Sequence, residues 1–238
     1  MNSLLLVPLG VVAGVLTSLS GQGGGLFLIV VLSYVSGPHT ALALTTPALF
    51  LGNVHRGWLS RAQVAWPLAR RIGLGAIPGA LLSGFFAGTA PAMLLKAFIV
   101  SLTALTVLRA LGYLKFTPPS GLATPAGAVV GFLTGTSGGA GVLLAPVTLS
   151  FGLTGVSYIG TQSVVAAGMH GARLLAYGHG GLLAGAGLLP IAGLTVGVFL
   201  GNALSGKLRP LLSPRAQRFT EVGMLSACAV LAIAGVGR

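Results

Sequence analysis

Long stretches of this chain carry no charged side chain. Residues 1–55, 116–172 and 174–206 contain no Lys, Arg, Asp or Glu. A helix that spans a lipid bilayer needs about 20 predominantly apolar residues, so each stretch exceeds a single crossing. Only 6% of the residues are charged, and the mean hydropathy is +0.97. The sequence therefore predicts an all-α polytopic membrane protein.

A glycine-rich interruption occurs twice in these apolar stretches, once within residues 13–29 and once within residues 130–146. At an offset of 117, the matching pairs are Gly14 and Gly131, Thr17 and Thr134, Ser20 and Ser137, Gly21 and Gly138, and Gly24 and Gly141. Broken helices at corresponding places in two halves are a sequence pointer to a transporter binding site. The freed backbone groups are tolerated at membrane depth only where they face protein, water or a ligand.

Five apolar elements are expected in each half of the chain. The expected ranges are 4–19, 26–35, 41–54, 72–89 and 92–112 in the first half, and 122–136, 142–153, 156–177, 182–205 and 219–236 in the second. Elements one and two of each half flank the glycine break. They are either two short helices that cross the membrane together or the half-helices of a re-entrant hairpin. We expect two repeats, 1–115 and 116–238, within one integral membrane domain.

The distribution of basic residues predicts that the two halves are inverted. Between elements three and four, the first half carries Arg56, Arg61, Arg70 and Arg71, and the second half carries only Arg173. Between elements four and five the pattern reverses, because the second half has Lys207, Arg209, Arg215 and Arg218 and the first half has none. Basic loops collect on the cytoplasmic side. We therefore expect the connector between the halves inside and both termini outside.

Small residues recur every four positions on element four of both halves. The two sets are Gly75, Gly79 and Ser83, and Gly193, Gly197 and Gly201. Such a face allows close helix–helix approach in lipid, so it is interpreted as a packing surface.

The charge balance favours an anion over a cation as the solute. The formal net charge is +12, and Glu221 is the single acidic residue. Part of this excess reflects the positive-inside bias, but a cation pathway normally offers carboxylates within the membrane. An oxyanion instead needs donors, and helix N-termini with freed N–H groups supply them. Glycine permits the close backbone approach that such a nest requires.

Candidate substrate-binding residues are therefore the glycines of the breaks and the hydroxyl, amide and basic groups near them. They are Thr17, Ser20, Gly21, Gln22, Gly23, Gly24, Gly25, Thr45, Thr134, Thr136, Ser137, Gly138, Gly139, Gly141, Gln162 and Arg173. Alternatives stay open for several of them. The glycines could serve tight packing at a bend, threonines often bond their own helix, and Asn53 and Gln162 could join helices. Arg56 is interpreted as a cytoplasmic anchor, and the four histidines as structural or interfacial residues.

Enzyme chemistry is not indicated. The chain has no Asp, no His-Glu-x-x-His motif and no nucleotide-binding glycine loop, and its one cysteine is Cys228. We expect no catalytic residue, no metal and no cofactor. Glu221 is expected to pair with Arg218 on the same helix face.

These features resemble one known family. The sequence Gly21-Gln-Gly-Gly-Gly25 follows the first apolar element, and the second copy places Pro146 where the first has Ile29. Together with the duplicated layout, the basic loop at Arg56 and the length, they are similar to TauE/SafE-type permeases, the sulfite-exporter and toluene-sulfonate-uptake family. The second copy, Gly138-Gly-Ala-Gly141, departs from the clean glycine triplet. The resemblance implies sulfur oxyanions or organosulfonates as substrates.

We therefore expect a secondary permease for a small anionic solute, most simply sulfite, thiosulfate or an organosulfonate, bound near the midplane at the two breaks. The alternatives are a membrane accessory protein without transport of its own and a metal-ion permease, which the lack of carboxylates disfavours. The expected partners are the anion and membrane lipid, with no nucleic acid. The expected location is the bacterial inner membrane.

Overall fold

The computed structural model describes residues 3–20, 23–113, 120–208, 211 and 213–235, and these residues form ten α-helices and no strand. In the first half the helices are α1 (Ser3–Ser20), α2 (Gly24–Ser36), α3 (Pro38–Leu59), α4 (Trp66–Thr89) and α5 (Ala92–Ala110). In the second half they are α6 (Ala123–Ser137), α7 (Ala140–Ser150), α8 (Gly155–His179), α9 (Leu188–Leu208) and α10 (Pro214–Ala234). Two one-turn 3₁₀ helices, η1 (Arg61–Gln63) and η2 (Ser120–Leu122), precede α4 and α6.

The ten helices match the ten expected elements, with four bounds that differ by five or six residues. Helices α3 and α4 extend toward each other beyond 41–54 and 72–89 and take in Arg56, Arg70 and Arg71, and α10 begins at Pro214, ahead of the expected range 219–236, and takes in Arg215 and Arg218. The expected ranges stopped at the first basic residue. A long basic side chain is nevertheless accommodated at a helix end, because its charged group can reach the membrane interface. Helix α9 begins six residues later than expected, because Gly181 and Gly187 adopt positive φ values of 71° and 68° ahead of it.

Helices α4, α5 and α9 are long and apolar enough to cross a membrane, as judged by length and composition within the described part of the chain. Helices α2 and α7 are apolar but short, with 13 and 11 residues. Each is shorter than the roughly 20 residues that one crossing requires. The short helices thus lie directly after the two glycine breaks.

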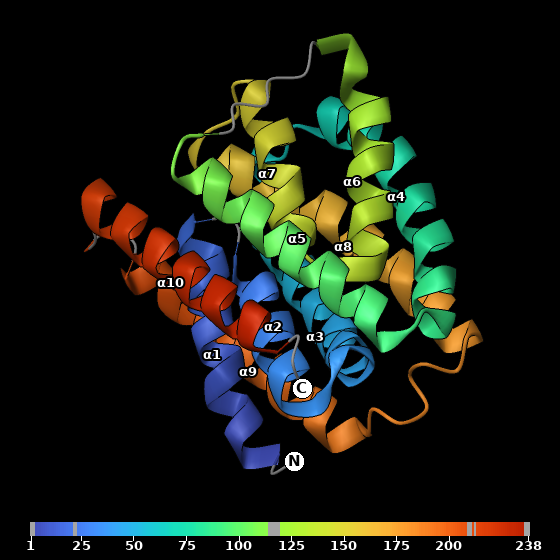
Figure 1. Cartoon of the computed structure of the whole chain (residues 1–238). Helices are drawn as coiled ribbons and strands as arrows, with labels where there is room; N and C mark the ends of the chain where they lie inside the picture. Colours follow the sequence, from blue (N-terminus) through green and yellow to red (C-terminus); the bar gives the residue numbers. More distant parts are fainter. Residues whose placement is uncertain (1–2, 21–22, 114–119, 209–210, 212, 236–238) are drawn as a thin grey trace.

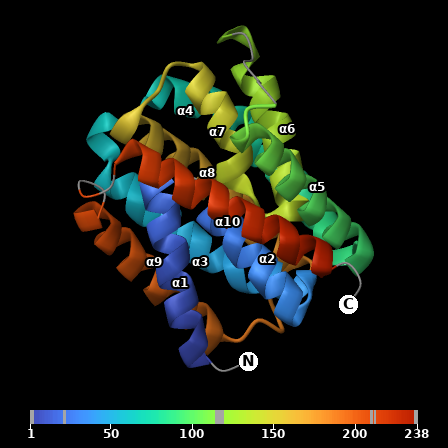
Figure 2. The same ribbon diagram turned by 60° about the vertical axis from the view of Figure 1, so that its left-hand side comes forward.

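The two halves exchange helices (Figures 1 and 2). Helix α1 packs along α9, and α4 packs along α6, so element one of each half lies on element four of the other. Helices α3 and α8, the third elements, pack against each other. In Figure 1 the first turn of α1 lies at the lower end of the molecule, whereas α6 begins at the upper end. This exchange is the one expected of halves related by a two-fold axis, and the inversion itself stays a prediction.

Glycines make the two exchanged contacts close. A Cβ at Gly14 would lie 3.0 Å from Gly201 Cα, and one at Gly197 would lie 2.9 Å from Gly10 Cα. At the other contact, a Cβ at Gly79 would lie 2.5 Å from the carbonyl oxygen of Ala128. The interpretation of element four as a packing face is therefore confirmed. Since lipid is as apolar as a core side chain, such close backbone contact is a main source of helix association in a membrane.

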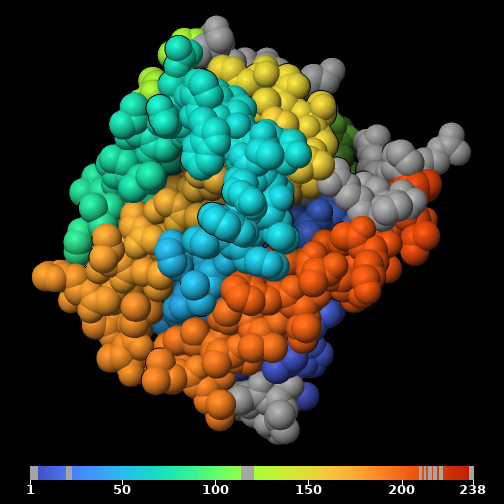
Figure 3. Space-filling model, turned by 180° about the vertical axis from the view of Figure 1, so that it is seen from behind, coloured from blue at the N-terminus to red at the C-terminus, as the bar shows by residue number. Residues whose placement is uncertain are grey.

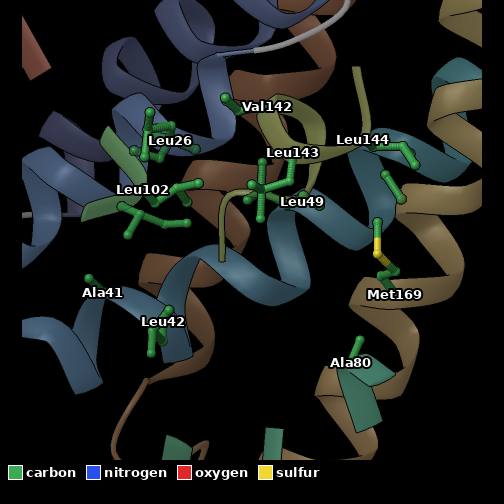
Figure 4. Close-up of a cluster of buried hydrophobic side chains, with 14 of the residues drawn as sticks. Leu26, Ala41, Leu42, Leu49, Ala80, Leu102, Val142, Leu143, Leu144 and Met169 are labelled. Atoms are coloured by element: carbon green, nitrogen blue, oxygen red, sulfur yellow. The ribbon is translucent and has the colours of Figure 1, made fainter. Parts of the chain in front are cut away.

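A continuous cluster of buried apolar side chains joins both halves. It includes Leu26 and Leu49 from the first half and Val142 and Leu143 from the second, part of which Figure 4 draws as sticks. This cluster surrounds the place where the two glycine breaks lie.

Candidate functional site

At each glycine break, the backbone between two helices takes a conformation that only glycine adopts easily. Gly23 precedes α2 with φ 94°, and Gly138 ends α6 with φ 75°. Positive φ values of this kind are readily reached by glycine alone. The N–H of Gly138 donates to Thr134 O at 2.7 Å and closes α6, and α7 starts two residues later. The chain is thus interrupted at matching places of its two halves.

The two breaks line one small cavity, as their matched positions led us to expect. The cavity is lined by Thr17, Gly23, Gly25, Leu26, Leu49, Asn53, Arg56, Gly138, Ala140, Gly141, Val142, Gln162, Ala166 and His170. Its volume is about 20 Å³, which is room for about one water molecule. The first turns of α2 and α7 lie at its wall. The positive ends of both helix dipoles therefore lie at this cavity. At α7 the N–H groups of Ala140 and Val142 already donate to Gly138 O and Gly139 O.

Arg56 brings a positive charge to the cavity and is only 6% exposed. Its Nη2 donates to Asn53 Oδ1, and Asn53 Nδ2 donates to Leu49 O at 2.7 Å. Its Nε and Nη1 are buried without a hydrogen-bond partner among the residues that the structure describes. No carboxylate occurs among the side chains that the structure describes, because Glu221, the only acidic residue, is not one of them. A buried charge without a partner is costly, so this site favours an anion.

Arg173 occupies the equivalent place in the second half and is fully buried. Its Nη1 lies 2.9 Å from His170 Nδ1, and its Nε and Nη2 each donate to the hydroxyl of Tyr177 at 3.1 Å. That hydroxyl donates in turn to Gly135 O at 2.6 Å. Because a guanidinium has only donors, His170 Nδ1 accepts and the neutral imidazole carries its proton on Nε2. Arg173 is therefore held within the protein.

The two arginines differ because the residue four positions later differs. At the offset of 117, Asn53 corresponds to His170, Arg56 to Arg173 and Ser60 to Tyr177. The residue three positions earlier binds the guanidinium in both halves. In the second half, the hydroxyl of Tyr177 also accepts a hydrogen bond from Arg173 Nε. The side chain of Ser60 is too short to accept from Arg56, so the Nε and Nη1 of Arg56 have no hydrogen-bond partner among the described residues.

Arg56 is the residue that the sequence interpretation missed. The interpretation as a cytoplasmic anchor is wrong, because the side chain is buried and lines the cavity. The usable signal was its match with Arg173 in a chain that offers almost no acidic partner. Asn53 and His170 also line the cavity and were not among the candidate binding residues.

Several expected binding residues do lie at the cavity. They are Thr17, Gly23, Gly25, Gly138, Gly141 and Gln162. Gln162 Nε2 donates to Gly141 O at 2.6 Å, while its Oε1 is buried and has no partner in the described ranges of the chain. Arg173 lies one layer behind, since a Cβ at Gly138 would be 3.0 Å from its Nη2. Gln162 therefore joins α8 to the second break and also faces the cavity.

The expected hydroxyl donors are already engaged. Thr17, Thr45, Thr134, Thr136 and Ser137 each donate to a carbonyl three or four residues earlier in the same helix. In this conformation they offer an anion lone pairs instead of protons. Of these five, only Thr17 lines the cavity. Gly21 and Gln22, and the side chain of Ser20, lie outside the described part of the structure.

Two of the expected binding glycines serve packing. A Cβ at Gly24 would overlap Ala13 O and Thr17 Oγ1 of α1, and one at Gly139 would overlap a methyl carbon of Leu102. Gly24 thus sets the close approach of α1 and α2, and neither glycine lines the cavity.

Comparison with known proteins identifies one family. The family model described as Sulfite exporter TauE/SafE matches residues 6–232, nearly the whole chain. No curated protein and no solved structure matches the chain.

Proposed function

Because the chain belongs to the sulfite exporter TauE/SafE family, we propose that it is a membrane permease for a small sulfur oxyanion such as sulfite or thiosulfate. The anion binds in the cavity between the two glycine breaks. The observation that carries this proposal is the buried guanidinium of Arg56, whose Nε and Nη1 lack a hydrogen-bond partner within the described part of the chain. An oxyanion would supply both the missing acceptors and the missing negative charge.

The backbone around the cavity adds to the attraction for an anion. The N-terminal turns of α2 and α7 contribute Gly25, Ala140 and Gly141 to the wall. Helix N-termini carry a partial positive charge that favours phosphate, sulfate and carboxylate groups. At α7 this attraction comes mainly from the helix dipole, because the N–H groups of Ala140 and Val142 already donate to Gly138 O and Gly139 O. A cation would meet Arg56 and two positive helix ends in the same small volume. The site therefore selects by charge before it selects by shape.

The size of the cavity favours an inorganic oxyanion over an organosulfonate. At about 20 Å³ it holds about one water molecule, so entry of any oxyanion requires α2 or α7 to move outward. A compact ion needs a smaller movement than a sulfonate with an organic group. Such opening and closing of one repeat against the other is the usual basis of alternating access in transporters with internal repeats.

The direct test is anion flux into vesicles that contain the purified protein. Arg56→Gln removes the charge but keeps polar character, and Arg61→Gln is the matched control, because Arg61 is exposed and stacks over Trp58 at 4.5 Å. We expect Arg56→Gln to weaken sulfite affinity at least tenfold, since charge-assisted hydrogen bonds contribute about 1.5–3 kcal/mol each and about 1.4 kcal/mol is a tenfold change. Arg61→Gln should transport normally. Unchanged affinity in folded Arg56→Gln protein would contradict the assignment.

The same vesicles distinguish the remaining alternatives. A membrane accessory protein without transport of its own would give no flux of sulfite, thiosulfate or a small sulfonate. A metal-ion permease would move a divalent cation and not the anions. The native location that we propose is the bacterial inner membrane.

A further inference from the structure

A second cavity lies away from the glycine breaks, on the outer face between α4 and α8. It is an open groove of about 560 Å³. Its lining is almost wholly apolar and includes Gly73, Ile77, Pro78 and Val164, with Trp66 and Arg70 at one end. Figure 3 views the molecule from behind, where α4 in teal lies beside α8 in amber.

The shape of the groove follows from one face of α4. Trp66, Arg70, Gly73 and Ile77 recur at steps of three and four residues and therefore share a face of the helix. Gly73 leaves this face hollow, because a Cβ there would meet only the side chain of Ile77, at 3.7 Å. The neighbouring α8 supplies Val164 and Val165 as the opposite wall. The result is an apolar channel that runs along a helix long and apolar enough to span the membrane.

The end of the groove carries a positive charge without a described negative partner. Arg70 is exposed and lies one turn after Trp66, the first residue of α4. Arg61 and Arg71 lie close to it in the sequence, and no acidic side chain is described anywhere in the structure. A tryptophan beside basic residues at the end of an apolar helix marks the level of lipid headgroups. Apolar length and positive end together match the two parts of a lipid.

We propose that this groove is a binding site for an anionic phospholipid. One acyl chain lies along Gly73, Ile77 and Val164, and the headgroup phosphate lies on Arg70. Basic positions between helices on the cytoplasmic side bind anionic headgroups because that leaflet carries the negative lipids. Free phosphate satisfies only the charged end, and a zwitterionic lipid only the apolar channel. The site does not involve Arg56 or the glycine breaks, so it is independent of the transported solute.

The test compares phosphatidylglycerol and phosphatidylcholine with identical acyl chains. Each lipid is added to the purified protein in detergent, and native mass spectrometry counts the lipid molecules that remain bound. Arg70→Gln removes the headgroup contact, and Arg71→Gln is the matched control, because Arg71 is exposed and adjacent but does not line the groove. Gly73→Leu fills the channel. Thermal unfolding with and without each lipid provides a second measurement.

We expect wild-type protein and Arg71→Gln to prefer phosphatidylglycerol. Arg70→Gln should lose about fivefold in affinity for that lipid, as expected for one basic residue at an anionic membrane surface, and should keep its weak affinity for phosphatidylcholine. Gly73→Leu should lose both lipids, and inorganic phosphate should not compete. Equal binding of the two lipids by wild-type protein, or equal losses in Arg70→Gln and Arg71→Gln, would overturn the proposal.

Discussion

The guanidinium of Arg173 donates two hydrogen bonds to the single hydroxyl of Tyr177, from Nε and from Nη2, each at 3.1 Å. It also lies against the tyrosine ring, with 5.1 Å between Cζ and the ring centroid. The equivalent position in the first half is Ser60, and the Nε of Arg56 there has no hydrogen-bond partner that the structure describes. One duplicated arginine is thus held by the protein, and the other is available to a ligand.

Removing the hydroxyl of Tyr177 should destabilise the protein. In Tyr177→Phe, two N–H groups of Arg173 and the carbonyl of Gly135 lose their partner inside the structure. We expect a loss of about 1–3 kcal/mol in the free energy of unfolding, the usual cost of unsatisfied buried polar groups. Thermal or denaturant unfolding in detergent measures it, with Tyr113→Phe as the control because Tyr113 is 77% exposed. Equal stability of the two variants would show that the hydroxyl does not hold Arg173.

Replacing the two arginines with methionine should give opposite results. Arg56→Met removes a buried charge without an ion-pair partner, so stability without anion should be unchanged or higher, as often happens when apolar residues replace buried charges. Arg173→Met leaves His170 Nδ1 and the Tyr177 hydroxyl without their hydrogen-bond donor and should therefore lower the free energy of unfolding. Added sulfite should raise the Tm of wild-type protein by mass action and leave that of Arg56→Met unchanged. A sulfite-dependent rise in Arg56→Met would place the anion elsewhere.

The helices were predictable from the sequence because charged residues and glycine clusters mark the ends of the apolar runs. Charge-free apolar runs and the glycine clusters predicted ten elements in the right order, and the bounds differ mainly where basic residues extend α3, α4 and α10 and where α9 begins late. The meeting of the two breaks also followed from the repeat, and Gly23 and Gly138 line one cavity. Periodicity and charge are properties of the chain itself, so they can be used before the fold is known.

The chemistry of the cavity was less accessible to sequence reasoning. Whether Arg56 lies in the interface or in the interior depends on which helices cover it, and this depends on the exchange of helices between halves. The same holds for Gly24, which is a packing residue because α1 lies directly against it. The direction in which a threonine hydroxyl donates is a local choice between its own helix and a ligand. Composition does not decide that choice for Thr45 or Thr134.

Adjacent glycines of the first break should respond differently to alanine. A Cβ at Gly24 would overlap the backbone of α1, whereas one at Gly25 would lie 3.3 Å from the side chain of Leu49, which can shift. We expect Gly24→Ala to lower folded yield and Tm strongly, because the backbone of α1 cannot move aside cheaply. Gly25→Ala should fold nearly as well as wild type. The ratio of monodisperse to aggregated protein on size exclusion provides the measurement, and similar yields would contradict the packing role of Gly24.

The inversion of the two halves predicts opposite membrane sides for the connector and the C-terminus. The basic loops reverse between halves, and α1 pairs with α9 as α4 pairs with α6. Reporter fusions at Ser120 and Arg238 should therefore indicate the cytoplasm and the external side, respectively. A fusion at Arg61, in the basic loop before α4, should agree with the one at Ser120. If the fusions at Ser120 and Arg238 report the same side, the halves are not inverted.

A carboxylate placed beside Arg56 should imitate the anion and block it. Asn53 Oδ1 already accepts from Arg56 Nη2, so Asn53→Asp introduces a negative charge at a contact that exists, with almost no change in volume. The variant replaces the 2.7 Å bond from Asn53 Nδ2 to Leu49 O, worth about 0.5–1.5 kcal/mol, with a repulsive contact between two oxygen acceptors, and the ion pair with Arg56 offsets part of this cost. The fold should therefore survive. Because the new carboxylate neutralises the guanidinium, sulfite affinity should fall at least tenfold, or about 1.4 kcal/mol.

Gln63→Glu is the control, because it adds the same charge on the exposed η1 helix and should leave sulfite affinity unchanged. Flux and sulfite-dependent Tm of both variants measure the difference. Normal sulfite affinity in folded Asn53→Asp protein would mean that the charge of Arg56 does not bind the substrate.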